Sequence, residues 1–392
     1  MKDSNRWQNN RGLLGLGFLV LIFLILVIVI VLAKHFSSSN TASKGDNKAE
    51  TDATTEAITE EAVTTVDDAI AAYIEGFNRE VTEDTTPPLI LSGATTNVQL
   101  GASSIPNPGL AIDDTDREIT FTYEGYYDLN QIGTYKVVRI GTDDAGNQTR
   151  QDVRLNVLAE LPKEEEVQRM PTLKIADAIA KYKTSDEISI GIDVSRWQGD
   201  IDWQKVKDSG VTFVMMRLGI KDGVKGDYSV DRNFVQYFKD AQAAGLRVGV
   251  YIYTYATCME DGVKDAMFVY NTLKENDFTP DLPIAFDWES FGSISTYMTS
   301  LNDLNDALQV FQGILEIAGY KTCLYNSKFY LASGIWENPD ENNIWLAQYN
   351  TEVTYTGKYF MWQCSNTGSV PGIYGDVDID IMYSEPLDKT AK

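Results

Sequence analysis

Histidine is almost absent from this chain of 392 residues, which contains one, His35. A serine or cysteine nucleophile that needs a histidine base is therefore excluded from the rest of the chain, and a zinc site built on histidine has no ligands. Cysteine is also scarce, and Cys258, Cys323 and Cys364 follow no metal-ligand spacing. We interpret them as small buried hydrophobic residues, with at least one free thiol because their number is odd. The sequence predicts no metal and no cofactor, so hydrolytic chemistry would have to use carboxylates, tyrosines or lysines.

Basic residues are outnumbered: 33 Lys and Arg stand against 57 Asp and Glu, which gives a formal net charge of −24. Nucleic-acid binding depends mainly on neutralising phosphates with Lys and Arg. A nucleic-acid partner is therefore excluded.

One long uncharged run is present at residues 12–33, which is enough to cross a bilayer as a helix. The preceding tail, residues 1–11, carries Lys2, Arg6 and Arg11. This charge bias predicts a cytoplasmic N-terminus, one membrane-spanning helix and extracellular C-terminal domains. A cleaved signal peptide is the alternative, since 31–33 resembles a cleavage site, but the run is longer than a usual signal core.

Residues 34–86 are rich in Ser, Thr and acidic residues, which predicts a disordered stalk. Apolar residues at helical spacing between residues 66 and 77 predict one short amphipathic helix inside it, with no identifiable partner. Residues 159–187 are expected to be a linker, with a short helix near 175–182, and residues 385–392 a C-terminal tail.

The segment 87–158 alternates apolar and polar residues, as in 118–123 and 134–140, between turn-forming clusters. This predicts a small antiparallel β-sandwich. The segment resembles bacterial immunoglobulin-like domains of surface proteins. The matching sequences are Asp84-Thr-Thr-Pro-Pro88, Gln131-Ile-Gly-Thr-Tyr135 and Thr142-Asp-Asp-Ala-Gly-Asn147. The resemblance implies a spacer or adhesive module whose protein partners are unknown.

Residues 188–384 show a strand-then-helix pattern, with helices expected over 231–244 and around 301–315. The pattern predicts an α/β (TIM-like) barrel. The last strands are too closely spaced for full helices between them, so this part of the barrel should be irregular. Strands are predicted at 188–194, 212–217, 247–253, 282–288, 321–325, 344–348, 359–363 and 377–382.

The apolar strand 282–288 ends in Asp287-Trp288-Glu289. Residues i and i+2 of a strand point to the same side, with Cα atoms roughly 6.5–7 Å apart. Two carboxylates that face one sugar-sized gap are the minimum equipment of a glycosidase. A solvated strand end is the alternative interpretation of this segment alone.

Further polar and aromatic residues fall at the expected ends of the other barrel strands, where barrel enzymes have their sites. Carboxylates and aromatic faces together are typical of carbohydrate binding. The predicted catalytic residues are Glu289, Asp287, Asp193 and Asp378. The predicted substrate-binding residues are Arg217, Tyr251, Tyr253, Tyr325, Gln348, Tyr349, Trp362 and Gln363.

Residues 188–383 resemble the glycoside hydrolase family 25 lysozymes. The resemblance rests on five sequences in order, Gly191-Ile-Asp-Val-Ser-Arg-Trp-Gln-Gly199, Gly249-Val-Tyr-Ile-Tyr253, Ala285-Phe-Asp-Trp-Glu289, Ile344-Trp-Leu-Ala-Gln-Tyr349 and Met361-Trp-Gln363 with Pro371-Gly-Ile373 and Val377-Asp-Ile379.

The resemblance implies cleavage of peptidoglycan at β-1,4 bonds between N-acetylmuramic acid and N-acetylglucosamine. It also implies that Glu289 is the general acid, Asp287 its partner carboxylate, and Asp193 and Asp378 the other acidic positions. One departure is Ile252-Tyr253, where many members have His-Phe. Two alternatives stay open: a wall-binding module without catalysis, and a glycosidase acting on another amino-sugar polymer such as chitin.

Overall fold

The computed structural model describes residues 65–80, 83–115, 118–163, 169–289 and 299–385. The chain divides into two units, residues 1–62 and 63–392, and all described residues belong to the second. The expected cytoplasmic tail and the expected membrane span at 12–33 lie outside the described residues. Within the described ranges, no helix is both long and apolar enough to cross a membrane.

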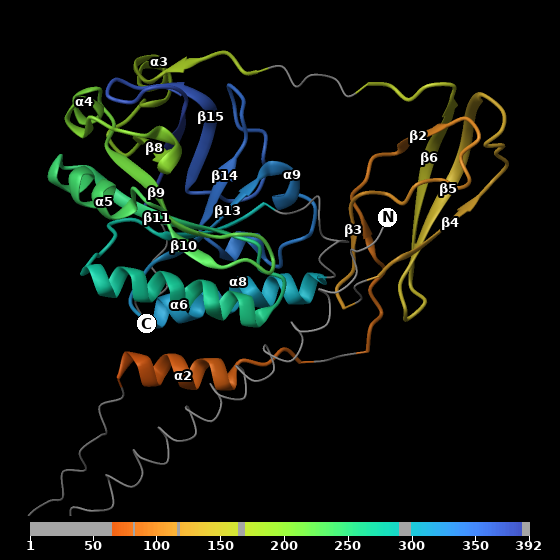
Figure 1. Ribbon diagram of the computed structural model, residues 1–392, viewed down its shortest axis with the longest axis horizontal. Coiled ribbons are helices and arrows are strands. Elements are labelled where there is room, and N and C mark those ends of the chain that lie inside the picture. Colours follow the sequence, from red (N-terminus) through yellow and green to blue (C-terminus); the bar gives the residue numbers. More distant parts are fainter. Residues whose placement is uncertain (1–64, 81–82, 116–117, 164–168, 290–298, 386–392) are drawn as a thin grey trace, which may run out of the picture. The chain divides into compact units, whose positions relative to one another are not determined.

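The C-terminal part of the chain is a closed barrel (Figure 1). It is one sheet of ten strands, of which the short strands β7 (Leu173–Lys174) and β10 (Tyr228–Val230) lie outside the ring. Strand β8 pairs with both β9 and β16, and this closes the ring. The ring follows the order β8 (Ser189–Val194), β9 (Phe213–Lys221), β11 (Arg247–Thr254), β12 (Ile284–Trp288), β13 (Thr322–Ser327), β14 (Ile344–Ala347), β15 (Met361–Ser369) and β16 (Val377–Met382).

The predicted barrel and its irregular last part are both confirmed. The pairs from β8 through β15 are parallel, whereas β16 runs antiparallel to both of its neighbours. The loop from β15 to β16 is a short connection across one end of the barrel, which only an antiparallel pair permits. Asp378 therefore stands at the start of β16, and this start lies at the same mouth where the parallel strands end.

Below the mouth at which the parallel strands end, the interior of the barrel is filled by an apolar core. Its members come from alternating, inward-pointing positions of the strands, as the two-residue period of a strand requires. Gly191 and Gly249 leave room for this core: a Cβ at Gly191 would lie 2.4 Å from the Phe213 ring, and one at Gly249 would lie 2.3 Å from Met215 Sδ. Other members of this core are Ala285, Cys323, Trp345, Met361 and Met382.

Helices cover the outside of the barrel, and a second, larger core lies between helices and strands. Helix α5 (Phe234–Ala243) confirms the helix expected over 231–244, and α8 (Leu301–Ile317) confirms the one expected around 301–315. Helix α6 (Met259–Asn276), which packs against α8, was not predicted. The three cysteines are free, and Cys323 and Cys364 are buried as expected, whereas Cys258 is only half-buried.

The barrel begins earlier than predicted, within the segment 159–187 that was expected to be a linker. Strand β7 pairs with β15, and helix α3 (Ile175–Tyr182) buries Ile175 and Ala178 in the outer core. The predicted short helix is thus confirmed, but its apolar face belongs to the barrel, so residues 173–187 are not a linker.

The segment 87–158 is all β, as predicted. Strands β4 (Thr120–Glu124) and β5 (Gly133–Thr142) confirm two expected strands. They form a four-stranded sheet in the order β2 (Thr95–Gln99), β6 (Gln148–Leu158), β5, β4. The sheet is not wholly antiparallel, because β2 pairs with β6 in parallel. Strands β1 (Leu89–Ile90) and β3 (Ala111–Ile112) form a separate pair.

The helix expected between residues 66 and 77 exists as α2 (Val66–Gly76), which begins at a capping box made by Thr65 and Asp68. It has a partner, because Ile70 is buried in the outer core and the Tyr73 hydroxyl donates to the Gln309 carbonyl of α8 at 3.3 Å. The end of the predicted disordered stalk is therefore ordered, because burying this apolar face offsets the cost of ordering the chain.

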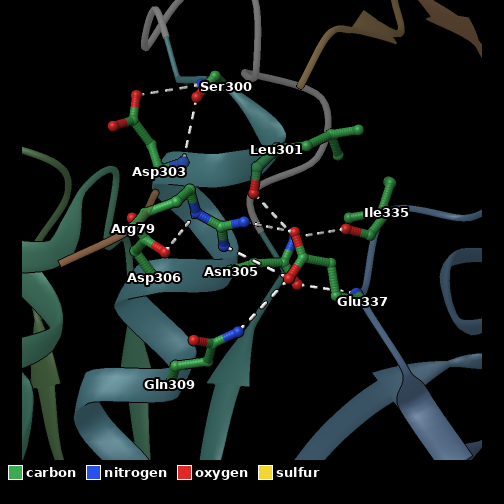
Figure 2. Close-up of polar contacts among 9 residues, drawn as sticks. All are labelled: Arg79, Ser300, Leu301, Asp303, Asn305, Asp306, Gln309, Ile335 and Glu337. Atoms are coloured by element: carbon green, nitrogen blue, oxygen red, sulfur yellow. Dashed lines mark hydrogen bonds and ion pairs between the residues drawn. The ribbon is translucent and has the colours of Figure 1, made fainter. Parts of the chain in front are cut away.

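Arg79, just beyond α2, joins this segment to two parts of the barrel (Figure 2). Its Nε lies 2.8 Å from Asp306 of α8, and its Nη1 lies 2.9 Å from Glu337. Asn305 ties the same two parts together, since its amide donates to the Ile335 carbonyl and accepts from the Glu337 backbone N–H.

Candidate active site

The end of β12 presents two carboxylates on one side of the strand, as predicted. Ile284, Phe286 and Trp288 pack in the outer core, and Ala285 packs in the barrel interior. Asp287 and Glu289 therefore follow Ala285 along the inward side, and both line one cavity at the barrel mouth. The alternative of a simple solvated strand end does not fit this placement, because the Asp287 side chain is buried.

The cavity has a volume of about 230 Å³ and all four predicted catalytic residues line it. Asp193 of β8 and Asp378 of β16 are direct cross-strand partners, so their Cα atoms are about 4.5–5.5 Å apart. Asp287 is paired in register with Tyr253 on one neighbouring strand and with Tyr325 on the other. Register thus explains how carboxylates distant in sequence meet at one mouth.

Gln363 of β15 is the hydrogen-bonding centre of one wall. Its Nε2 donates to Asp193 Oδ2 at 2.7 Å, and its Oε1 accepts from the hydroxyls of Tyr325 at 2.8 Å and Tyr349 at 3.0 Å. These bonds fix the orientation of the amide and of two aromatic rings before any ligand arrives.

Arg217 of β9 lines the cavity but is already paired. Its Nε and Nη2 lie 2.9 and 2.7 Å from Asp231 Oδ2, and both side chains are buried. Asp231 also accepts from the backbone N–H groups of Arg196 and Asn233. The pair therefore links β9 to the segment after β8 and to the start of α5.

Six of the eight predicted substrate-binding residues line the cavity, and two do not. The Trp362 indole is buried on the other side of β15, where it donates to the Gln348 carbonyl and packs edge-on against Tyr182. The Gln348 side chain bonds to Thr354. Neighbouring residues of an extended chain point to opposite sides, so Gln363 and Tyr349 exclude Trp362 and Gln348 from the cavity. The six that line it are Arg217, Tyr251, Tyr253, Tyr325, Tyr349 and Gln363.

Sequence reasoning missed one buried carboxylate and several wall residues. Asp380 is fully buried beneath Asp378 on the same side of β16, and its Oδ1 accepts from Trp345 Nε1 at 2.8 Å. The alternation of Val377-Asp-Ile-Asp380 carried the signal, because i and i+2 share a side. The cavity-lining residues outside the predicted set are Val194, Ser195, Trp197, Gln198 and Trp345.

The crowding of acids raises their pKa values. Burial, followed by the charge of Asp193, raises the pKa of Asp378 to about 9. Burial, followed by the charge of Asp380, raises the pKa of Asp193 well above its usual range. Burial also raises the pKa of Asp380. These shifts favour the protonated forms of the three carboxyl groups, which limits the repulsion between them.

Asp287 and Glu289 form a coupled pair. Burial, and then the charge of Glu289, raises the pKa of Asp287 well above its usual range. Burial raises the pKa of Glu289, whereas its contact with Asp287 lowers it. Glu289 is exposed at the rim, and this limits the effect of burial on it. Burial therefore favours the protonated form of both members of this pair.

Asp287 has a further property that bears on ligand binding. Its Oδ1 is buried and has no hydrogen-bond donor among the described residues. A buried acceptor without a partner carries a cost that a ligand N–H or O–H group can relieve.

Comparison with known proteins agrees with this geometry. Residues 192–373 match the family model described as glycosyl hydrolases family 25. The autolytic lysozyme of Clostridium acetobutylicum is 27% identical over 202 residues, which are 50% of this chain and 56% of that protein. Lysozyme M1 of Streptomyces globisporus is 26% identical over 201 residues, 48% of this chain and 65% of that protein.

Solved structures similar to this chain include the modular autolysin LytC from Streptococcus pneumoniae, with 21% identity, a TM-score of 0.46, and coverage of 63% of this chain and 56% of that one. A family 25 glycosyl hydrolase from Bacillus anthracis has 21% identity, a TM-score of 0.41, and coverage of 52% and 94%. This chain thus spans about half the length of the first relatives named. From the family match and the order of the five sequences around the cavity, residues 192–373 are a glycosyl hydrolases family 25 domain.

Proposed function

We propose that the protein is a peptidoglycan hydrolase of the muramidase type, which cleaves β-1,4 bonds between N-acetylmuramic acid and N-acetylglucosamine. The observation that carries the proposal is the placement of Asp287 and Glu289 side by side at a cavity walled by Asp193, Asp378 and tyrosines. Two relatives of the domain are named lysozymes, in agreement with this substrate.

Glu289 is the general acid in this proposal, because it lies at the rim where the leaving oxygen of a bound glycan would arrive. Asp287 and Glu289 form a coupled pair, and burial favours the protonated form of both. An acetamido N–H of the substrate that donates to Asp287 Oδ1 favours the ionised form of Asp287. The proton that the pair shares then moves to Glu289, where it is available for the leaving group.

Ionised Asp287 then stabilises the positive charge that develops at the sugar. Its unpartnered Oδ1 also orients the acetamido group so that the carbonyl oxygen of this group can attack the anomeric carbon. Such participation by the substrate is a known exception to the two-carboxylate scheme. We therefore propose retention of configuration without a carboxylate nucleophile.

Purified peptidoglycan and chitin, incubated separately with the protein, test the function. Mass spectrometry of the products should show reducing ends at muramic acid from peptidoglycan and little release from chitin. Cleavage of chitin alone would favour a different amino-sugar glycosidase. Binding to both polymers without new reducing ends would indicate a wall-binding module without catalysis.

We further propose that residues 12–33 anchor the protein in the cell membrane and that residues 34–392 lie outside the cell, with 87–158 as an immunoglobulin-like spacer. The support is the uncharged run after Lys2, Arg6 and Arg11. Protease added to cells stripped of their wall should release the barrel. A barrel protected from protease would contradict this orientation.

A further inference from the structure

Trp197 is a large aromatic side chain left in solvent at the cavity mouth. It is 73% exposed and lines the cavity. The other tryptophans that the structure describes are no more than 5% exposed. An exposed indole beside a polar cavity indicates a surface that a ligand covers.

The backbone around Trp197 is fixed by local hydrogen bonds. Trp197 lies in a 3₁₀ helix, Arg196–Gln198, which Ser195 and Gln198 cap reciprocally. The Arg196 backbone N–H donates to the buried Asp231 at 3.0 Å. The guanidinium of Arg196 lies over the indole, 5.0 Å from the ring centroid. The ring is therefore presented on a rigid support.

Tyr374, which is 94% exposed, lies on a neighbouring loop. The loop turns at Gly372 and Gly375, whose φ angles of 98° and 96° favour glycine. The Gly372 carbonyl accepts from the Asp202 N–H at 2.9 Å. Gln198 Nε2 donates to the Asp376 carbonyl at 3.2 Å, so this loop is joined directly to the segment that carries Trp197.

The two aromatic residues belong to segments that adjoin strands on the other side of the ring from β12. Trp197 follows β8 and Tyr374 precedes β16, and these strands are adjacent in the ring. Strand β12, which carries Glu289 at its end, is three strands from β8 in one direction and four from β16 in the other. A glycan that enters the cavity at Glu289 and extends across the mouth therefore reaches the rim formed by Trp197 and Tyr374.

We propose that Trp197 and Tyr374 form a sugar-stacking subsite that makes the enzyme selective for an extended β-1,4-linked amino-sugar chain. The cavity, about 230 Å³, is smaller than the roughly 300–1,000 Å³ of common small-molecule pockets, so a polymer must leave sugars outside it. The apolar C–H face of a pyranose fits the face of an aromatic ring. The subsite rests on the proposed function because it uses the same substrate.

Tryptophan fluorescence of the Glu289→Gln protein tests the subsite without turnover. Soluble glycan strands prepared from peptidoglycan should reduce the quenching of emission by acrylamide, because they cover Trp197. The Glu289→Gln/Trp197→Phe protein lacks this one indole and should show little of the protection. The difference between the two proteins therefore isolates Trp197. Sedimentation with cell walls shows separately that the protein binds. Unchanged quenching by acrylamide in a protein that binds in this way would overturn the proposal.

Kinetics on glycan strands give the second measurement. Trp197→Ala and Tyr374→Ala should each raise KM about tenfold for long strands with little change in kcat, and have a smaller effect on the shortest cleavable fragment. Tyr126→Ala is the matched control, since Tyr126 is 77% exposed but lies between β4 and β5. An equal loss on short and long strands, or none, would contradict the subsite. Failure of the wild-type protein to cleave any strand would count against the proposed function, and the quenching measurement would then decide the subsite alone.

Discussion

Asp378→Asn should make the barrel more stable at neutral pH while it impairs catalysis. The Asp378 carboxyl has a pKa of about 9 in the folded protein against 3.8 for the ordinary group. Between these values the folded state binds a proton that the unfolded state has released. The free energy of unfolding therefore falls as pH rises through this window, and asparagine, which does not titrate, removes that loss.

The size of the effect follows from the shift. One pKa unit corresponds to about 1.4 kcal/mol, so the interval from 3.8 to pH 7 gives at most about 4 kcal/mol. The charges of Asp193 and Glu289 act on Asp378, and this coupling reduces the expected gain to about 2 kcal/mol. For a barrel of this size that is a rise in Tm of about 4–8 °C.

Thermal unfolding at pH 4 and pH 7.5 is the assay. The control is Asp186→Asn, because Asp186 is exposed. The Asp378→Asn protein should match the wild type at pH 4 and exceed it at pH 7.5. Its rate of glycan cleavage should also fall, because Asp378 lines the cavity. This reasoning would be refuted by a variant that is less stable than the wild type at pH 7.5. It would also be refuted by a variant whose Tm differs from the wild-type Tm by the same amount at both pH values.

Three further predictions follow from other parts of the fold. Gly191→Ala should lower the free energy of unfolding by about 1–3 kcal/mol in denaturant titration, since its Cβ would overlap the Phe213 ring; an unchanged midpoint would contradict the tight interior. Ile70→Ala should destabilise the barrel by about 2–5 kcal/mol, whereas Val66→Ala on the exposed side of α2 should not; equal effects would show that α2 does not pack as described. Chelator should leave glycan cleavage unchanged, and loss of activity that zinc restores would overturn the carboxylate mechanism.

Much of the barrel could be predicted because its strands are buried on both sides and end in polar residues. The segments that were missed lack that contrast. Helix α6 mixes charged and apolar residues, and its first turn carries Glu260 and Asp261. Strand β7 is two residues long and pairs with β15, which is distant in the sequence, so no local pattern marks it.

The site was predictable where a strand's alternation determines which side chains face inward. Asp287 and Glu289 follow that rule, and Asp380 would have followed it from Asp378. Gln348 and Trp362 were misplaced because adjacent residues were both assigned to the cavity. Asp231 gave no signal, since its role is a contact with Arg217 across two elements. The distribution of the proton within the Asp287–Glu289 pair depends on burial, which the sequence does not specify.

The central claim is that Glu289 donates the proton that breaks the glycosidic bond. The most direct test is the rate of reducing-end release from peptidoglycan by Glu289→Gln beside its binding to the same walls. Glutamine keeps the shape and removes the donor, so the rate should fall by at least about 10²–10⁴-fold, while sedimentation with walls stays unchanged. A Glu289→Gln protein that cleaves at near the wild-type rate would contradict the assignment of Glu289 as the acid.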